Sequence, residues 1–376
     1  MIYWEKDADV EENNENSTFI EDIINGMFDW VRVIDRQDNI VYINNSMAQA
    51  FHPSIKGKKC YAALGRTEPC DNCISRQTVF EGNPHEKEEI INGRVFSVMS
   101  SPVKNRKGQI VYVVEVLRDI TQMKQLQSEI IEQNHKLQSN LSMAKRLQCS
   151  LLPKGLPENK IDFSFVYKPC EDLGGDFLDI FSIDEDRIGI YIADVSGHGV
   201  PASMLTVFLR SAMNKKLVSP AQALEQLYTE FNNSQFDHDL YITVFYAVID
   251  LKQQKLIFSN AGHNVCPVLF NTGRFEILRS SGIPISNWLK KPGYCDSAMD
   301  LIQGDRIFFY TDGIVELRNS SGEQYGEKRL LDILLEDNTG ISNSLNRIVE
   351  SACEFADIGD TLQIPDDITM ALLEIK

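Results

Sequence analysis

Ala193-Asp194-Val195-Ser196-Gly197-His198-Gly199 places an aspartate where an apolar, β-type run ends and a glycine turn begins. Three other segments share this feature: Leu173-Gly174-Gly175-Asp176, Tyr310-Thr311-Asp312-Gly313 and Pro365-Asp366-Asp367-Ile368-Thr369. At such positions a side chain can leave the sheet and converge with others on one point. Converged carboxylates repel one another and take up protons, unless a bound divalent cation keeps them ionised. The sequence therefore predicts a metal-dependent enzyme.

The composition is ordinary for a soluble globular protein. The 376 residues, of which 43% are hydrophobic and 24% charged, can form two domains. The net charge of −17 argues against a nucleic-acid partner, since such binding needs basic side chains. No apolar run reaches the ~18 residues that a membrane span requires, and residues 1–7 lack the pattern of a signal peptide. We expect a cytoplasmic location, and eight dispersed cysteines that are mostly reduced thiols.

The first part of the chain indicates a small α+β domain. Residues 1–18 are predicted to form a loose leader, because they are acidic and rich in asparagine. Within residues 19–118, β-type runs at 30–35 and 40–44 flank a polar turn, and further runs occur at 94–99 and 110–117. This order, together with Val116-Leu117-Arg118-Asp119-Ile120-Thr121 at the end, resembles a PAS sensor domain.

Residues 119–152 are predicted to form one long helix. The segment contains no proline or glycine, and Pro153 and Gly155 end it. Residues recur at steps of three and four along a heptad seam: Met123, Gln127, Ile130, Asn134, Leu137, Leu141, Ala144 and Gln148. The helix either packs on its own chain or joins two subunits as a parallel coiled coil with Asn134 fixing the register. We favour the homodimer, because the helix lies between two domains.

The remaining residues, 153–376, are predicted to form an antiparallel β-sandwich flanked by helices. Runs typical of strands occur at 188–193, 242–249, 255–259, 306–310 and 368–374. Helical patterns occur at 202–216, 220–232, 327–335 and 342–356. Successive strands with few helices between them favour a sandwich over a doubly wound sheet. The whole chain is thus expected to be α+β.

Six motifs in this region follow a characteristic order. They are Gln148 with Leu151-Leu152-Pro153, Leu173-Gly174-Gly175-Asp176-Phe177-Leu178-Asp179, Asp194-Val195-Ser196-Gly197-His198-Gly199-Val200-Pro201-Ala202, Asn260-Ala261-Gly262-His263-Asn264, Gly304-Asp305 with Tyr310-Thr311-Asp312-Gly313-Ile314-Val315-Glu316, and Asp366-Asp367-Ile368-Thr369. Together they resemble a PPM-type, metal-dependent protein serine/threonine phosphatase of the bacterial SpoIIE/RsbU class.

The resemblance implies a site for two Mn²⁺ or Mg²⁺ ions. Asp194 would bridge the ions and Val195 would offer its backbone carbonyl. Asp312 and Asp366 would complete the coordination of one ion, and Asp176 would bind the other ion or its water molecules. Hard divalent cations prefer oxygen ligands, and two of them can activate a water for attack on phosphorus. We therefore expect Asp194, Asp312 and Asp176 to be the catalytic residues.

Neighbouring residues allow more than one interpretation. Asp179 and Asp367 are expected to be structural, whereas His198 and His263 are either general acids or turn residues. Ser196 lacks the glycine elbow of a hydrolase nucleophile. Where eukaryotic relatives hold phosphate with an arginine, this chain has Lys168-Pro169-Cys170-Glu171-Asp172, which suits a folded phosphoprotein substrate. By resemblance this would be an anti-sigma-factor antagonist; the alternatives are a non-catalytic binding module and a small-molecule phosphatase.

Cys60, Cys70 and Cys73 form the only cysteine cluster of the sequence. Their spacing is compatible with zinc, an iron–sulfur centre, a redox thiol pair or simple packing. A signal from this domain would pass through the helix at 119–152 to the metal site.

Overall fold

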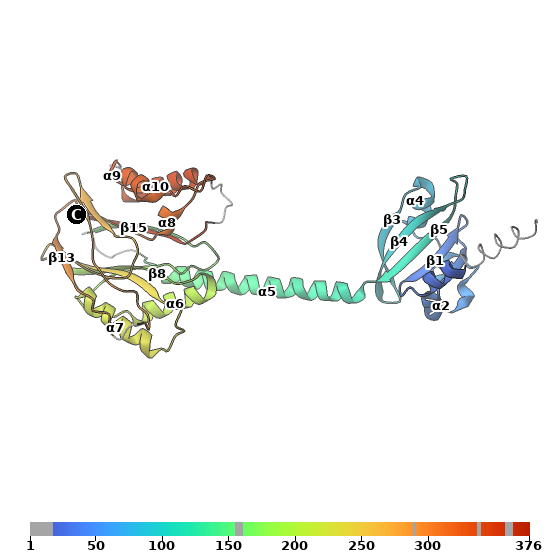
Figure 1. The fold of residues 1–376 in the computed structure, drawn as a ribbon, viewed down its shortest axis with the longest axis horizontal. Coiled ribbons are helices and arrows are strands. Elements are labelled where there is room, and N and C mark those ends of the chain that lie inside the picture. The colour runs from blue at the N-terminus through green and yellow to red at the C-terminus, as the bar shows by residue number, and fades with distance from the viewer. Residues whose placement is uncertain (1–17, 155–160, 289–290, 337–339, 358–363) are drawn as a thin grey trace, which may run out of the picture. The chain divides into compact units, whose positions relative to one another are not determined.

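The computed structural model describes residues 18–154, 161–288, 291–336, 340–357 and 364–376. The predicted leader lies outside the described residues, apart from Thr18. The chain divides between Lys136 and Leu137 into two compact units. The division falls within helix α5 (Thr121–Leu151), which Figure 1 shows as one uninterrupted helix.

The N-terminal unit contains one antiparallel sheet with the strand order β2-β1-β5-β4-β3. Its strands are β1 (Trp30–Asp35), β2 (Ile40–Ile43), β3 (His85–Ile91), β4 (Arg94–Lys104) and β5 (Ile110–Asp119). The segment between β2 and β3 forms α2 (Asn45–Phe51), a 3₁₀ turn (Pro53–Ile55), α3 (Cys60–Ala63) and α4 (Ile74–Glu81). The predicted β1–β2 hairpin and the α+β class are confirmed.

The core of this unit is centred on Trp30. Its ring stacks on Phe96 with centroids 4.3 Å apart and meets Phe51 edge-on at 4.9 Å. These contacts join the two small apolar clusters of the sheet. The buried ion pair between Arg32 on β1 and Glu115 on β5, 2.6 Å apart, ties the same strands together.

Helix α5 extends over almost the whole predicted range. It starts beyond Asp119, whose carboxylate accepts hydrogen bonds from the backbone and the hydroxyl of Thr121 at 3.0 and 2.6 Å. Apolar side chains of the helix are more than half exposed: Met123, Leu126, Ile130, Leu137, Met143 and Leu147. Gln148 is different, because only 5% of its surface is exposed. Gln148 was predicted to lie on the heptad seam, but its side chain packs within its own chain.

The C-terminal unit is the predicted antiparallel sandwich. One sheet has the order β13-β10-β9-β8-β7 and the other β12-β11-β14-β15-β6. The first comprises β7 (Phe177–Ser182), β8 (Arg187–Val195), β9 (Ile242–Asp250), β10 (Lys255–Ala261) and β13 (Ser297–Asp300). The second comprises β6 (Ile161–Lys168), β11 (Val268–Asn271), β12 (Arg274–Ile277), β14 (Arg306–Tyr310) and β15 (Ile368–Ile375).

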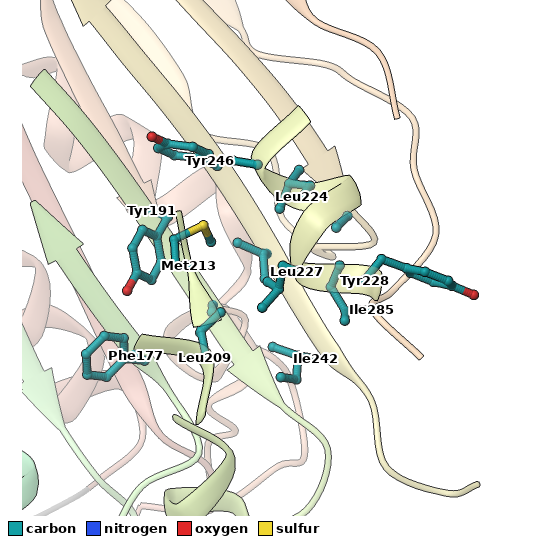
Figure 2. Packing of buried hydrophobic residues seen from close by; sticks show 14 of the residues in the cluster. Phe177, Tyr191, Leu209, Met213, Leu224, Leu227, Tyr228, Ile242, Tyr246 and Ile285 are labelled. Atoms are coloured by element: carbon teal, nitrogen blue, oxygen red, sulfur yellow. The ribbon is translucent and has the colours of Figure 1, made fainter. Parts of the chain in front are cut away.

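Helices cover the outer face of each sheet. Helices α6 (Gly199–Ala212) and α7 (Pro220–Asn233) pack on the first sheet, and Figure 2 shows Leu209, Leu224 and Leu227 of these helices beside Tyr191 and Tyr246 of the strands. Helices α8 (Gly313–Glu316), α9 (Gly326–Glu336) and α10 (Ile341–Phe355) pack on the second sheet. A third cluster of apolar side chains fills the space between the two sheets. The resulting four layers fix where the aspartate-bearing strand ends meet.

Candidate metal centre

Asp194 lies near the C-terminal end of β8. The strand is buried along most of its length, and Asp194 pairs with Thr243 on β9. The hydroxyl of Thr243 donates a 3.1 Å hydrogen bond to the backbone carbonyl of Asp194. The next residue, Val195, bonds to the backbone of Gly175: the N–H of Val195 donates a 3.2 Å hydrogen bond to the carbonyl of Gly175. The Asp194–Val195 step is therefore held beside the loop that carries Asp176.

Asp367 organises that loop. One oxygen of its carboxylate accepts the backbone N–H groups of Gly175 and Asp176 at 2.5 and 3.1 Å, and the other accepts the N–H of Cys170 at 2.7 Å. A Cβ atom at Gly174 would lie 2.7 Å from a carboxylate oxygen of Asp367, so only glycine fits there. Asp367 thus has the structural role that the sequence predicted, since its oxygens serve backbone donors.

Gly313 brings two other aspartates together. A Cβ atom on this glycine would overlap the backbone carbonyl of Asp367. The backbone beginning α8 therefore lies directly against the Asp366–Asp367 segment before β15, and Asp312 and Asp366 flank that contact. The amide of Asn264 donates a 3.0 Å hydrogen bond to Asp312.

Asp176 is buried, with 2% of its surface exposed. The hydroxyl of Thr311 donates to its carboxylate at 2.7 Å, and the same hydroxyl accepts the backbone N–H of Thr369 at 3.0 Å. Thr311 therefore links Asp176, which precedes β7 of one sheet, to β14 and β15 of the other. The segments that carry the four aspartates lie against one another at this end of the sandwich.

The charges of these aspartates act on one another. Burial, followed by the charges of Asp312, Asp366 and Asp367, raises the pKa of Asp194 to about 7. Burial, followed by Asp194 and Asp367, raises the pKa of Asp176 well above its ordinary value. Such crowding of carboxylates is relieved when a divalent cation lies among them. By charge and by their all-oxygen chemistry, these residues fit Mg²⁺ or Mn²⁺.

The carboxylates do not form a closed ligand set. Within the described residues, no three side chains of His, Cys, Asp or Glu are grouped so that they could hold a metal ion. Three of the carboxylates accept hydrogen bonds from the protein instead. Asp176 accepts one from the hydroxyl of Thr311, Asp312 one from the amide of Asn264, and Asp366 one from the backbone N–H of Asp367. The aspartates are electrostatic neighbours, and gathering around an ion requires their side chains to turn.

The two histidines have different surroundings. The ring of His263 is buried, its Nε2 lies 3.0 Å from the carbonyl of Tyr310, and its Nδ1 lies 3.4 Å from the hydroxyl of Thr243. Burial lowers the pKa of His263, which favours a neutral ring that donates from Nε2. His198 is exposed, and its Nδ1 lies 2.9 Å from Glu171. The geometry therefore favours the packing role for His263.

The glycines near the aspartates serve two purposes. Gly197 and Gly199 have φ angles of 85° and 72°, which side chains rarely adopt. Gly174 and Gly175 instead leave room, since a Cβ at Gly175 would lie 3.1 Å from the carbonyl of Val195.

Gln148 was predicted both on the heptad seam and in the first phosphatase motif, and its contacts place it beside the candidate site. Its amide nitrogen donates to the carbonyl of Gly174 at 2.7 Å and to the hydroxyl of Thr206 at 3.3 Å, and its amide oxygen accepts the N–H of Gly174 at 3.2 Å. One side chain of α5 thus binds the loop that precedes Asp176. Its proximity to the Leu-Leu-Pro motif was the available signal. Lys168 is exposed at the end of β6.

The three clustered cysteines lie in the N-terminal unit. Cys60 begins α3 and is buried, whereas Cys70 and Cys73 are partly exposed before α4. All three line one small cavity beside Arg32 and Glu115. Across the described part of this domain too, no grouping of three metal-binding side chains occurs.

A two-sheet sandwich with acidic strand ends defines the PP2C-like class of phosphatase domain, preceded here by a sensor-type domain. The chain belongs to the SpoIIE family: the model of stage II sporulation protein E matches residues 184–376, and a PAS domain model matches residues 25–122. Both resemblances expected from the sequence are therefore confirmed.

Curated relatives and one solved structure are similar to this chain. Phosphoserine phosphatase RsbU of Bacillus subtilis is 24% identical over 313 residues, which are 81% of this chain and 90% of RsbU. Phosphoserine phosphatase RsbP of the same organism is 26% identical over 183 residues, 47% of this chain, and the match spans 45% of RsbP, less than half its length. The SiaA-PP2C domain of Pseudomonas aeruginosa, 21% identical, superposes with a TM-score of 0.56 over 65% of this chain and 98% of that domain. This last likeness supports the fold alone.

Proposed function

We propose that the protein is a metal-dependent protein serine/threonine phosphatase that removes phosphate from a regulatory phosphoprotein. The observation that carries this proposal is the contact of the four aspartate-bearing segments at one end of the sandwich, where Asp367 binds the loop of Asp176, Gly313 lies against Asp367, and Val195 bonds to Gly175. Two relatives named as phosphoserine phosphatases support the activity.

The residues that would hold two Mn²⁺ or Mg²⁺ ions are Asp194, Asp312, Asp366, Asp176 and the carbonyl of Val195. Such ions, when bound, lower the pKa of a water molecule and neutralise the phosphoryl oxygens. The chain's own contribution is positional: hydrogen bonds fix the backbone of the loop that carries Asp176 beside Asp367 and Val195. A backbone fixed in advance limits the rearrangement to rotations of the ligand side chains.

Three uncharged groups perform this positioning. Thr311 holds the carboxylate of Asp176, and Asn264 holds that of Asp312. Gln148 holds the backbone ahead of Asp176. Because hydroxyl and amide groups do not titrate near neutral pH, they orient the acids without competing for the ions.

We infer that the substrate is a folded phosphoprotein, and from the resemblance to the SpoIIE/RsbU class an anti-sigma-factor antagonist. The exposed Lys168 is no clear substitute for the phosphate-binding arginine expected in eukaryotic relatives, so recognition would depend on the metal ions and on the surface of the partner protein. Among the described residues, no helix is long and apolar enough to cross a bilayer.

We also propose that α5 joins two copies of the chain as a parallel coiled coil. Its exposed apolar side chains include Ile130 and Leu137, which are 58% and 60% exposed. A second copy would cover them. Since Gln148 near the end of the same helix binds the loop before Asp176, a change in helix packing can reach the metal site. Removing residues 1–118 should alter phosphatase activity; unchanged activity and response to stimuli would contradict this route.

The test of the activity is turnover of a phosphorylated anti-sigma-factor antagonist with Mn²⁺. Asp194→Asn should abolish turnover, whereas Asp162→Asn, an exposed aspartate at the opposite end of β6, should not. Rapid turnover of small phosphate esters without preference for the phosphoprotein would favour a small-molecule phosphatase. No turnover of either class would favour a binding module.

A further inference from the structure

The cysteine cluster of the N-terminal domain contains a pair whose geometry permits a disulfide. Cys70 and Cys73 are separated by Asp71 and Asn72, which form a turn. The first and fourth residues of a β-turn have Cα atoms less than about 7 Å apart, and a disulfide needs about 4.4 to 6.8 Å. Both cysteines line the same cavity, of about 20 Å³, and both are partly exposed. Oxidants in solution can therefore reach them.

A cation acts on one of the two sulfur atoms. The Nη1 atom of Arg66 donates a 3.0 Å hydrogen bond to Sγ of Cys70, while its Nη2 atom pairs with Glu89 on β3. Glu89 also pairs with Lys87 at 2.5 Å, which fixes the carboxylate. The guanidinium is thus held against Cys70. A guanidinium beside a cysteine stabilises the thiolate, which is the nucleophilic form.

Cys73 occupies the N-terminal cap position of α4, whose eight residues run from Ile74 to Glu81. Helix N-termini favour negative charge on a nearby sulfur. Cys60 differs, because it is buried and burial raises its pKa to about 12. It is therefore a poor nucleophile near neutral pH. Buried Cys60 therefore differs from the two partly exposed cysteines.

We propose that Cys70 and Cys73 form a peroxide-sensitive dithiol in which Arg66 activates Cys70. The Cys70 thiolate attacks one oxygen of hydrogen peroxide, the O–O bond breaks, and the departing hydroxide takes a proton to leave as water. Cys73 then attacks the sulfenic sulfur, the S–S bond forms, and a second water leaves. Two thiols lose two electrons in total, and one peroxide gains them. This inference is independent of the proposed phosphatase activity.

The grouping of side chains argues for this chemistry over a metal centre. Zinc and iron–sulfur sites need three or four converging ligands. The described residues offer no such group, and one of the three thiols is engaged by an arginine.

The experiment uses the reduced full-length chain, treated with hydrogen peroxide, alkylated and digested with trypsin. Cleavage after Arg66 and Arg76 yields a peptide that contains Cys70 and Cys73, whereas Cys60 lies in the preceding peptide. We expect the first peptide to lose two hydrogen masses and to escape alkylation. Cys60→Ser should leave this product unchanged, and Cys70→Ser and Cys73→Ser should each prevent it.

Variants of the arginine separate activation from mere proximity. Arg66→Gln should slow the loss of free thiols by about fivefold or more, Arg66→Lys should retain part of the rate, and Arg118→Gln, which breaks an exposed ion pair on β5, should retain all of it. A Cys60–Cys73 disulfide, independent oxidation of single thiols, a rate indifferent to Arg66, or stoichiometric zinc that protects all three thiols would each overturn the proposal.

Discussion

Replacing Gly313 with alanine should disable the metal centre while leaving most of the fold intact. The added Cβ would overlap the carbonyl oxygen of Asp367, a backbone atom that cannot rotate away as a side chain can. The start of α8 and the segment before β15 must then move apart. Overpacking of this kind costs about 1 to 3 kcal/mol of unfolding free energy.

The effect on activity should exceed the effect on stability. Asp312 precedes Gly313 and Asp366 precedes Asp367, so the separation displaces two proposed ligands of the same ion. A displacement of about 1 Å in a catalytic arrangement can lower the rate by about 100-fold. We therefore expect Gly313→Ala to lose about 100-fold in kcat/KM and to require more Mn²⁺ for half-maximal turnover.

The assay compares phosphoprotein turnover over a range of Mn²⁺ concentrations with urea unfolding of the same preparations. Gly273→Ala is the matched control, because its Cβ would meet only the side chain of Asn271, at 4.0 Å. It should change stability by less than about 0.5 kcal/mol and leave turnover intact. Wild-type turnover and Mn²⁺ dependence in a folded Gly313→Ala protein would refute the reasoning.

Four further perturbations test separate parts of the account. Thr311→Val removes the hydrogen bond to Asp176 and the acceptor of the Thr369 N–H, so turnover should fall by about tenfold and the unfolding free energy by about 1 to 3 kcal/mol, whereas Thr311→Ser, which keeps the hydroxyl, should retain turnover; wild-type turnover by folded Thr311→Val would contradict a positioning role. Burial raises the pKa of Asp194 to about 7, so this carboxyl stabilises the metal-free fold below its unfolded pKa of ~4 and loses that contribution as pH rises through 7. The urea midpoint of metal-free wild type relative to Asp194→Asn should therefore fall between pH 5 and 8, and a flat difference would contradict the assignment. Gln148→Ala leaves buried backbone groups without their partner and should cost about 1 to 3 kcal/mol, which chemical denaturation measures. Ile130→Glu should convert the dimer to monomer in sedimentation analysis; a wild-type monomer would contradict the coiled coil.

The layers of the fold were predictable where the sequence pattern is local. The long runs that became β8, β9 and β15 are apolar because both their faces are buried, and such runs are visible in a single sequence. Strand β3 was missed, because His85, Lys87 and three glutamates place charge on an edge strand whose residues alternate between exposed and part-buried. Strand β6 was missed as well, and its pairing with β15 along its full length is a long-range contact.

In the candidate site, too, the features with a local sequence pattern were predictable and the long-range contacts were not. Aspartates beside glycines marked the segments that meet, and the structural role predicted for Asp367 agrees with its bonds to backbone N–H groups, whereas Asp366 faces the charges of the site. Gln148 was assigned to a heptad seam because its spacing fits one. Its amide instead binds a loop 26 residues away, a contact that helical periodicity cannot reveal.

Anomalous X-ray diffraction from crystals grown with Mn²⁺ tests the metal centre most directly. We expect two manganese peaks among Asp176, Asp194, Asp312 and Asp366, with the carbonyl of Val195 as a further ligand, and no peaks in Asp194→Asn crystals. Manganese bound elsewhere, with no ion among the four aspartates, would contradict the proposed function.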